Sequence, residues 1–382
     1  MAAPDPNRPC RGACRAMRIG VVSNAYHPDI GGVETHVKRL CAGLVAAGDD
    51  VEVITQHSVQ SVENIDGVVV RRFPLTVPAG NYRLSVPLWR WLRAHAGEYD
   101  VLHAHSYHAL AALCAALGNR SPLVFTPHYH GTGHTRFRAA LHPLYRPLGR
   151  AVMNRASAVV CVTSAERELV LRDFPEVGSR AVVIPNGTDP RPAATRRPAT
   201  GKTRRILCVG RLEQYKRVDR VIRAMTRLGP EHRLDVVGTG PSADRLRQLA
   251  AGLGLAGRVV FHGRLDDAAF ESCVAQASAA VSASAHEAFG MSVADALAAG
   301  LPTVATPIPA HREVAGLAGD SAWLRFADPE DETALAAALE AAAAAGRTRP
   351  AILPTWDDVV GATRNIYAAV AHRTTPVGAV AR

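Results

Sequence analysis

The sequence predicts an α/β protein built from two doubly wound halves, and three observations carry this prediction. Apolar strand-like segments alternate with helical stretches along most of the 382 residues. These segments are apolar throughout, which suits parallel strands covered on both faces. A polar stretch rich in Pro, Ala, Thr and Arg, residues 189–203, separates two such series. We therefore expect two Rossmann-like domains joined by a linker, because a chain of this length exceeds one ordinary core.

The first half begins with MRIGVVSNAYHPDIGGVETHVKRLCAGLVAAGDDVEVITQ, residues 17–56. We expect a strand, a glycine loop, an amphipathic helix and a second strand there. Gly31 and Gly32, which lack a Cβ, would let the backbone approach a ligand or turn with positive φ. Further strands are expected in VVVRRF, DVLHAHS, LVFTPHY and AVVCVTS. This alternation predicts a first domain over residues 17–188.

The second half repeats the alternation in RRILCVGRL, LDVVGTG, VVFHGRL, AAVSASA and PTVAT, which predicts a domain over residues 204–350. ALAAALEAAAAAG is expected to be helical by propensity alone. WDDVVGATRNIYAAVA predicts a closing helix within residues 351–372, with Val359, Thr363, Ile366 and Val370 on one face. Ligands of such sheets bind at the carboxyl ends of the strands, so we expect the site in a cleft between the halves.

Composition narrows the function classes. The net charge of +10 is spread along the chain, which argues against a dedicated nucleic-acid surface. The seven cysteines lack the paired spacing of a zinc site or a disulfide scaffold. No apolar run has the length of a signal peptide or a membrane span, so we expect a cytoplasmic protein. Residues 1–16 and 373–382 are expected to be a disordered extension and tail.

Six motifs follow one another along the chain: GGVETHV (31–37), IPNGTD (184–189), VGRLEQYK (209–216), GTGP (238–241), FHGRL (261–265) and HEAFGMSVADALAAGLPTVAT (286–306). In this order and spacing the chain resembles a family 4 glycosyltransferase of the GT-B fold, from about residue 17 to about residue 370. The resemblance implies transfer of a sugar from a nucleotide diphosphate donor with retention of the anomeric configuration and without a metal or other cofactor. It also implies an acceptor-binding first domain, a donor-binding second domain and a last helix that crosses back to the first.

Two cations of the second half suit a diphosphate leaving group. Arg211 and Lys216 follow the strand RRILCVG. A diphosphate gains negative charge as the glycosidic bond breaks, and a fixed guanidinium and ammonium stabilise that charge most in the transition state. In an arbitrary sequence two such residues would be surface cations, but their place in VGRLEQYK favours the catalytic interpretation.

The stretch FGMSVADALAAGLPTVAT, residues 289–306, combines a helix that begins at a glycine turn with an acid, Asp295, in its first turns. Backbone N–H groups at the helix start suit a phosphate or sugar oxygen. The resemblance implies that Asp295 contacts the ribose diol and that Glu287, on the preceding loop, accepts hydrogen bonds from sugar hydroxyls. Neither acid then needs to lie against the phosphates and repel them. The donor-binding residues that the resemblance implies are Gly31, Gly32, Arg211, Lys216, Gly238, Arg264, Leu265, Glu287, Phe289, Gly290, Met291, Ser292 and Asp295.

Asp295 departs from the family pattern, which usually has Glu at both ends of an E-x7-E spacing. The side chain is shorter by one C–C bond, about 1.5 Å. The ribose contact is then weakened, mediated by water or restored by a backbone shift. The alternative role of Asp295 is charge compensation at the helix N-terminus.

Histidines follow two strand ends of the first half. TPHYHGTGHT carries His128, His130 and His134, and HAHSYH carries His103, His105 and His108. The H-x-H-x3-H spacing is compact enough for a metal, but we favour a site without metal. His128 matches the family's histidine near the reacting sugar carbon, and the catalytic residues implied are His128, Arg211, Lys216 and Glu287. His103, His105 and His108 either shape the acceptor pocket or are polar residues at a strand end, and we favour the second interpretation.

The sequence leaves partners and some alternatives open. The segment NYRLSVPLWRWLRAH (81–95) interleaves Leu and Trp with Arg, and a surface helix that packs inward is favoured over a peripheral membrane contact at the inner face, because Pro87 interrupts the pattern. The donor is expected to be a nucleotide-diphosphate sugar, with UDP preferred, and the acceptor a hydroxyl of a lipid, cyclitol, glycan or natural product. Competing classes are a nucleotide-sugar epimerase and a non-catalytic sugar-nucleotide or nucleic-acid binding protein. Oligomeric state is not specified.

Overall fold

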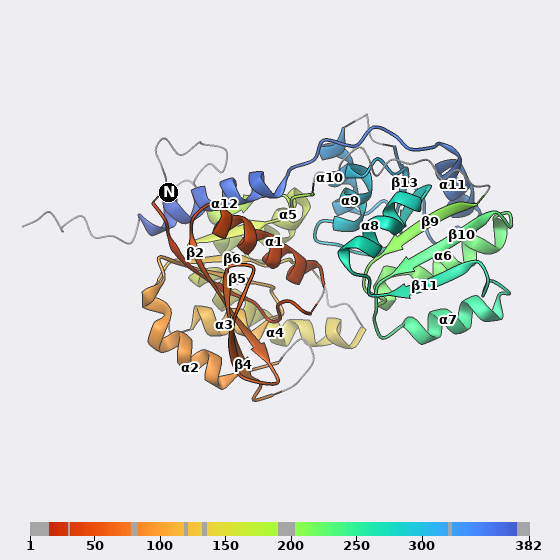
Figure 1. Cartoon of the computed structure of the whole chain (residues 1–382). Coiled ribbons are helices and arrows are strands. Elements are labelled where there is room, and N and C mark those ends of the chain that lie inside the picture. Colours follow the sequence, from red (N-terminus) through yellow and green to blue (C-terminus); the bar gives the residue numbers. More distant parts are fainter. Residues whose placement is uncertain are drawn as a thin grey trace, which may run out of the picture. The chain divides into compact units, whose positions relative to one another are not determined.

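The computed structural model describes residues 15–29, 31–77, 83–117, 121–131, 136–189, 203–319 and 323–372, with only the backbone described for 136–144. The chain forms two compact units, one reaching to Gly187 and including the segment from Trp356 onward, and one spanning Thr188–Thr355 (Figure 1). The positions of the two units relative to one another are not determined, so the cleft expected between them stays an expectation.

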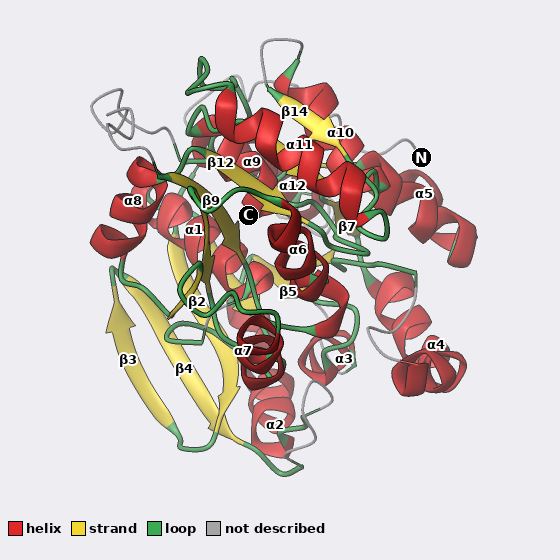
Figure 2. Cartoon of the chain, turned by 90° about the vertical axis from the view of Figure 1, so that its right-hand side faces the viewer, coloured by secondary structure: helices red, strands yellow, loops and turns green. Residues whose placement is uncertain are grey.

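The first unit is built on an eight-stranded sheet in the order β3-β4-β2-β1-β5-β6-β7-β8. Seven strands are parallel, and β3 runs antiparallel to β4 at the outer edge (Figure 2). The strands are β1 (Arg18–Val22), β2 (Asp50–His57), β3 (Ser61–Ile65), β4 (Val68–Pro74), β5 (Val101–His105), β6 (Leu123–Thr126), β7 (Ala158–Cys161) and β8 (Ala181–Val183). The alternation in the sequence did not predict β3. Asp66 and Gly67 form its turn with positive φ values of 52° and 85°, which suits a two-residue hairpin turn.

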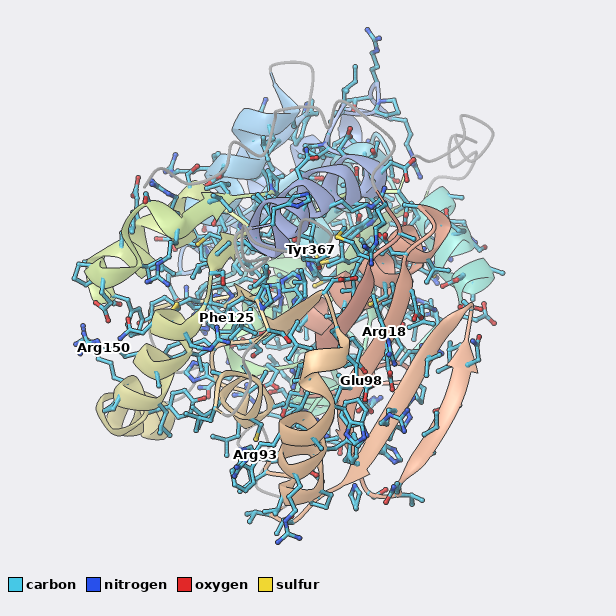
Figure 3. All side chains as sticks on the ribbon, turned by 90° about the vertical axis from the view of Figure 1, so that its left-hand side faces the viewer. Arg18, Arg93, Glu98, Phe125, Arg150 and Tyr367 are labelled. Carbon is cyan, nitrogen blue, oxygen red and sulfur yellow. The ribbon has the colours of Figure 1, made fainter. Side chains whose placement is uncertain are left out.

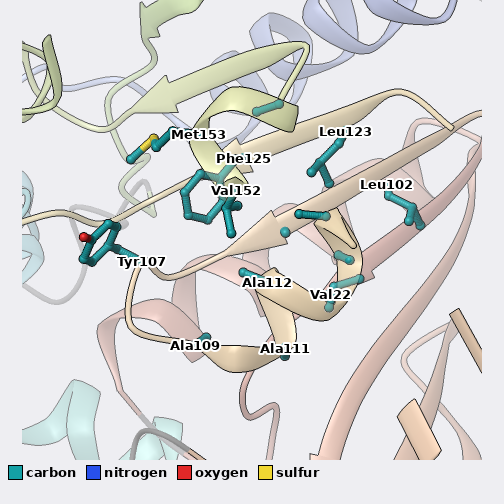
Figure 4. Close-up of a cluster of buried hydrophobic side chains, with 14 of the residues drawn as sticks. Val22, Leu102, Tyr107, Ala109, Ala111, Ala112, Leu123, Phe125, Val152 and Met153 are labelled. Carbon is teal, nitrogen blue, oxygen red and sulfur yellow. The ribbon is translucent and has the colours of Figure 1, made fainter. Parts of the chain in front are cut away.

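Helices cover both faces of this sheet. They are α1 (Gly32–Ala46), α2 (Val86–His95), α3 (Leu110–Ala116), α4 (Arg136–Arg155), α5 (Ser164–Asp173) and α12 (Trp356–Ala371), with 3-10 helices at Ala96–Glu98 and Pro175–Arg180. Figure 4 shows one core cluster, in which Leu102 and Phe125 of the strands pack with Ala112 of α3 and Met153 of α4. Arg18, the first residue of β1, forms an ion pair with Glu98, with 3.2 Å between Nη1 and Oε2 (Figure 3).

Helix α12 is tied into the first unit by its predicted apolar face and by polar contacts. Val359, Thr363, Ile366 and Val370 are all buried, as expected. Tyr367 lies on the side of α12 that faces the sheet (Figure 3), and its hydroxyl is 2.6 Å from Nδ1 of the buried His103. His103 is therefore a core residue that holds α12 rather than a strand-end polar residue.

The second unit has a six-stranded parallel sheet in the order β11-β10-β9-β12-β13-β14. Its strands are β9 (Arg204–Val209), β10 (His232–Val237), β11 (Val259–Gly263), β12 (Ala279–Ser282), β13 (Thr303–Ala305) and β14 (Leu324–Phe326). Its helices are α6 (Val218–Ala224), α7 (Ala243–Gly252), α8 (Asp267–Gln276), α9 (Met291–Ala298), α10 (Pro309–Ala318) and α11 (Glu332–Ala344), with 3-10 helices at Gln214–Lys216 and Met225–Arg227. The strand order reverses between β9 and β12, where ligands of such sheets bind.

The predicted fold class is confirmed: both units are doubly wound α/β structures, with sheets that are parallel apart from β3. Residues 351–355, grouped in the sequence with the closing helix, belong to the second unit, where Ala351 donates to the carbonyl of Leu297 at 2.9 Å. Most of the expected linker, residues 190–202, and of the expected extension, residues 1–14, and all of the tail, 373–382, lie outside the described residues. In the part that the structure describes, no helix is long and apolar enough to span a membrane.

Candidate functional site

The loop that follows β9 carries Arg211 and Lys216 and is braced by the loop that follows β10. The N–H of Leu212 donates to the carbonyl of Thr239 at 2.9 Å, and the N–H of Gly210 donates to that of Val237 at 3.0 Å. Gly238 has a φ of 131°, and a Cβ there would collide with the carbonyl oxygen of Gly210. Besides the donor-binding role that the resemblance implies, Gly238 meets a packing requirement, because the two loops lie too close together for a side chain.

Lys216 forms an ion pair with Glu287, which lies 71 residues further along the chain. The Nζ of Lys216 is 2.5 Å from Oε1 of Glu287, and each side chain is 15% exposed. Burial alone would lower the pKa of Lys216, but the Glu287 carboxylate outweighs it and raises that pKa. Burial alone would raise the pKa of Glu287, and Lys216 instead holds it below its usual value. Both groups are therefore charged at neutral pH.

Arg211 has a different environment from Lys216. Its side chain is 48% exposed, and its Nη2 lies 2.5 Å from Oε1 of Glu213. An ion pair this exposed contributes little to folding stability, so the guanidinium is available to an incoming anion. Glu213 was not singled out in the sequence, although it stands within the VGRLEQYK motif.

Helix α9 is preceded by its N-cap Gly290, which takes a left-handed conformation with φ 97° and ψ 48°. A Cβ at this position would approach the ring of His311 to 2.8 Å. The ring itself is fixed because its Nδ1 is 2.9 Å from the carbonyl oxygen of Thr306. Glycine is thus required where α9 begins, and Met291 and Ser292 form its first turn as expected, with Phe289 buried before it.

Asp295 lines a cavity beneath α9. The walls combine apolar side chains of β9 and α8, among them Val209 and Phe270, with the polar residues Ser292 and Asp295 of α9. Leu265 packs against the same apolar cluster as Val209 and Phe270, whereas Arg264 is exposed. The structure therefore brings Leu265, Ser292 and Asp295 to one region of the second unit, at the reversal of its strand order.

The glycine loop of the first unit lacks the positive φ values that were one of the two expectations for it. Gly31 precedes α1 with extended backbone, φ −170°, and Gly32 is the first helical residue. Neither has the positive φ that we considered for this turn, so that explanation of the glycines is wrong. A Cβ at Gly32 would meet nothing within 4 Å, which leaves open space at the start of α1.

His128 lies just beyond β6, in a cluster of neutral histidines. Its ring centroid is 5.2 Å from that of His36 and 5.8 Å from that of His105. His36 is buried, and its Nδ1 is 2.9 Å from Oδ1 of Asn186 in the IPNGTD motif. Burial lowers the pKa of His36 to about 4, and burial together with the neighbouring imidazoles holds the pKa values of His105 and His128 well below the usual range.

The ring nitrogens of His36, His105 and His128 lie within 4.8 Å of one another. Zn–N distances of about 2.0–2.1 Å in a tetrahedral site imply nitrogens about 3.4 Å apart, so the imidazoles would have to move together to hold zinc. This group differs from the H-x-H-x3-H set considered in the sequence, of which His134 lies outside the described residues.

Helix α2 packs inward, as favoured from the sequence. Leu88 and Leu92 are buried, and Trp91 is only partly exposed and stacks on His95 at 4.7 Å between ring centroids. Pro87 lies in the first turn after the N-cap Ser85. A helix tolerates proline there because the N–H has no partner within the helix, so the expectation that Pro87 interrupts the pattern is wrong.

The two parallel-sheet α/β units match the GT-B fold of solved glycosyltransferases. Within this class the chain belongs to glycosyltransferase family 4. Residues 30–191 match the family model "Glycosyltransferase Family 4", and residues 193–350 match "Glycosyl transferases group 1".

Named relatives cover most of the chain. A phosphatidyl-myo-inositol mannosyltransferase of Mycolicibacterium smegmatis is 32% identical over 351 residues, 85% of this chain and 84% of the relative. A glycogen synthase of Mycobacterium tuberculosis is 29% identical over 401 residues, 92% and 95% of the two chains. The structure of HepE of Anabaena in complex with UDP and glucose has a TM-score of 0.67 at 18% identity, covering 94% of this chain and 98% of HepE, and supports the fold.

Proposed function

We propose that the protein transfers a hexose from a UDP-sugar to a hydroxyl acceptor, with retention of the anomeric configuration and without a metal or other cofactor. The observation that carries this proposal is the Lys216–Glu287 pair beside the loop that leads into α9. An ammonium that is charged at neutral pH suits the diphosphate leaving group, and a carboxylate that is charged at neutral pH suits the hydroxyls of the sugar.

The remaining donor residues are assigned by chemistry. Arg211 exchanges Glu213 for a donor phosphate, and the first-turn N–H groups of α9 point to oxygen atoms of the phosphate or sugar. Asp295 accepts hydrogen bonds from the ribose diol at the mouth of the cavity beneath α9. UDP is proposed as the nucleotide because HepE, a neighbour of the same fold, is in complex with UDP and glucose.

The first unit is proposed to bind the acceptor and to contribute His128, with Gly31 and Gly32 giving a ligand room at the start of α1. His128 is neutral at physiological pH, so it orients hydroxyls by hydrogen bonds and adds no charge. Attack from the front face, with a departing phosphate oxygen accepting the acceptor's proton, needs no protein nucleophile. The acceptor classes that relatives' names suggest are a phosphatidylinositol and a glycan end.

We also propose a cytoplasmic location, which the free thiols of Cys41, Cys114, Cys161, Cys208 and Cys273 support. A peripheral membrane contact through α2 is a weaker proposal, because its leucines are buried.

The test is a donor and acceptor screen in EDTA. UDP-glucose, UDP-galactose, GDP-mannose and ADP-glucose are each incubated with phosphatidylinositol, inositol and maltooligosaccharides, and nucleoside diphosphate release and product are measured. We expect one UDP-sugar to give an α-linked product from its α-configured donor. A β-linked product would refute retention, and turnover only after addition of Mg2+ or Mn2+ would refute metal independence.

A further inference from the structure

His128 has a backbone conformation that needs external support. Its φ is 48°, in the left-handed region that side chains with a Cβ rarely adopt. Such conformations persist only where the surrounding structure holds them, and they gather at functional sites. The residues that hold the peptide on either side of His128 therefore control where its ring points.

The peptide that follows His128 is held by Glu166, in the first turn of α5. Glu166 is 2% exposed. Its Oε1 accepts the N–H of Tyr129 at 2.5 Å, and its Oε2 accepts the N–H of Val162, just beyond β7, at 2.6 Å. One carboxylate thus uses both oxygens to join the His128–Tyr129 peptide to the end of a neighbouring strand. Hydrogen bonds to an ionised acceptor are shorter and stronger than neutral ones.

The sequence T-S-A-E at residues 163–166 has the pattern of a capping box. Thr163 is the N-cap of α5, and its Oγ1 accepts the N–H of Glu166 at 3.0 Å. In an ordinary capping box the glutamate serves its own helix by accepting the N–H of the N-cap residue. Here its carboxylate reaches one residue further back, to Val162, and across to Tyr129, so it also serves the segment that carries His128.

A second contact joins the same segment to the other end of α5. The hydroxyl of Tyr129 donates to Oδ2 of Asp173, the last residue of α5, at 2.7 Å. Tyr129 is therefore bound to α5 at both its backbone and its side chain. The helix forms a rigid frame for the residue that follows His128.

We propose that Glu166 is a positioning residue for sugar transfer, which holds the His128–Tyr129 peptide so that the His128 ring keeps its place. This inference rests on the proposed function of His128. Glu166 touches no substrate in this scheme and acts only through His128.

The test compares Glu166→Gln with Thr163→Ala. The first variant keeps the side chain's size but removes the charge and one of the two acceptors, and the second weakens the cap of the same helix while keeping the carboxylate. We expect Glu166→Gln to lower kcat about tenfold or more, with the donor KM changed less than about twofold, because the loss lies in transition-state positioning. Thr163→Ala is expected to keep kcat within about twofold. Equal kcat losses in both variants would reduce Glu166 to a helix-capping role and overturn the proposal.

A double-mutant cycle with His128→Ala shows whether Glu166 acts through His128. If it does, adding Glu166→Gln to His128→Ala lowers kcat by less than about twofold, whereas losses that multiply identify an independent, structural effect and overturn the proposal.

Amide hydrogen exchange gives a readout that is independent of turnover. We expect the Tyr129 N–H to exchange at least about tenfold faster in Glu166→Gln but not in Thr163→Ala, and unchanged exchange would overturn the proposal. If His128→Ala transfers sugar at the wild-type rate while Tyr129 exchange responds as expected, the anchoring of the peptide is supported, and it is the proposed function of His128 that fails.

Discussion

Mild acid is expected to destabilise the first unit through four buried histidines: His36, His103, His105 and His128. Burial lowers the pKa of His36 to about 4 and that of His103 to about 3, and burial with neighbouring imidazoles holds the other two well below the usual range. In the unfolded chain each histidine takes up a proton near pH 6.5. The unfolded state thus binds more protons, so the stabilisation is complete above about pH 6.5 and is lost as the pH falls toward the folded pKa values.

The size of this loss in the free energy of unfolding follows from protonation of the histidines in the unfolded chain alone. Between about pH 7.5 and 5.5 each histidine that stays neutral in the folded state lowers the free energy of unfolding by about 1.4 kcal/mol. Four such residues give at most about 5 kcal/mol, on the order of 10 °C in the melting temperature of a unit of this size.

Tryptophan fluorescence during urea unfolding at about pH 7.5, 6.5 and 5.5 measures this loss. Trp89, Trp91 and Trp356 lie in the first unit, and Trp323 lies in the second. His105→Leu is the matched variant, because neither ring nitrogen of His105 has a hydrogen-bond partner among the described residues. It is expected to shrink the acid-dependent loss by about 1.4 kcal/mol. An unfolding free energy that stays constant or rises between the highest and the lowest of these pH values would refute the reasoning.

Three further predictions concern the second unit. Lys216→Met should lower turnover about 10²- to 10³-fold and destabilise the unit by leaving Glu287 unpaired; adding Glu287→Gln should recover urea stability but not turnover, and recovered turnover would contradict the assignment. Asp295→Glu should lower the donor KM several-fold, which is the effect of about one gained hydrogen bond, because the longer side chain reaches further toward the ribose. A higher KM in steady-state kinetics would speak against a ribose contact. Glu213→Gln should tighten nucleoside diphosphate binding in calorimetry by a few-fold, since its carboxylate competes for Arg211, whereas Arg211→Ala should weaken it; equal affinities in all three proteins would exclude that competition.

Much of the fold was predictable because it depends on local pattern. Apolar runs such as RRILCVG and AAVSASA predict buried parallel strands, and the positions directly after them predict which side chains reach the functional edge of each sheet. Arg211 was found this way. The edge hairpin of β3 was missed because its residues are largely exposed, so they carry no apolar alternation, although Asp66-Gly67 is a hairpin signal.

Pairings over long separations could not be predicted from one sequence. The Lys216–Glu287 contact spans 71 residues and that of His36 with Asn186 spans 150, and spacing along the chain does not encode such distances. The resemblance implies donor binding for Gly238, but its packing against Gly210 depends on where two loops meet in the fold, which the sequence does not show. Glu166 showed only a capping pattern, and its second role depends on where the loop after β6 lies.

The measurement that tests the proposed donor site most directly is the melting temperature of the purified protein in EDTA, with UDP, GDP, ADP or NAD and with Lys216→Ala alongside. A ligand at about 100 times its dissociation constant adds about 2.7 kcal/mol, a shift of several degrees. We predict a shift with UDP that Lys216→Ala abolishes. A shift with NAD alone, or a UDP shift of the same size in Lys216→Ala, would contradict a nucleotide-sugar site at Lys216 and Glu287.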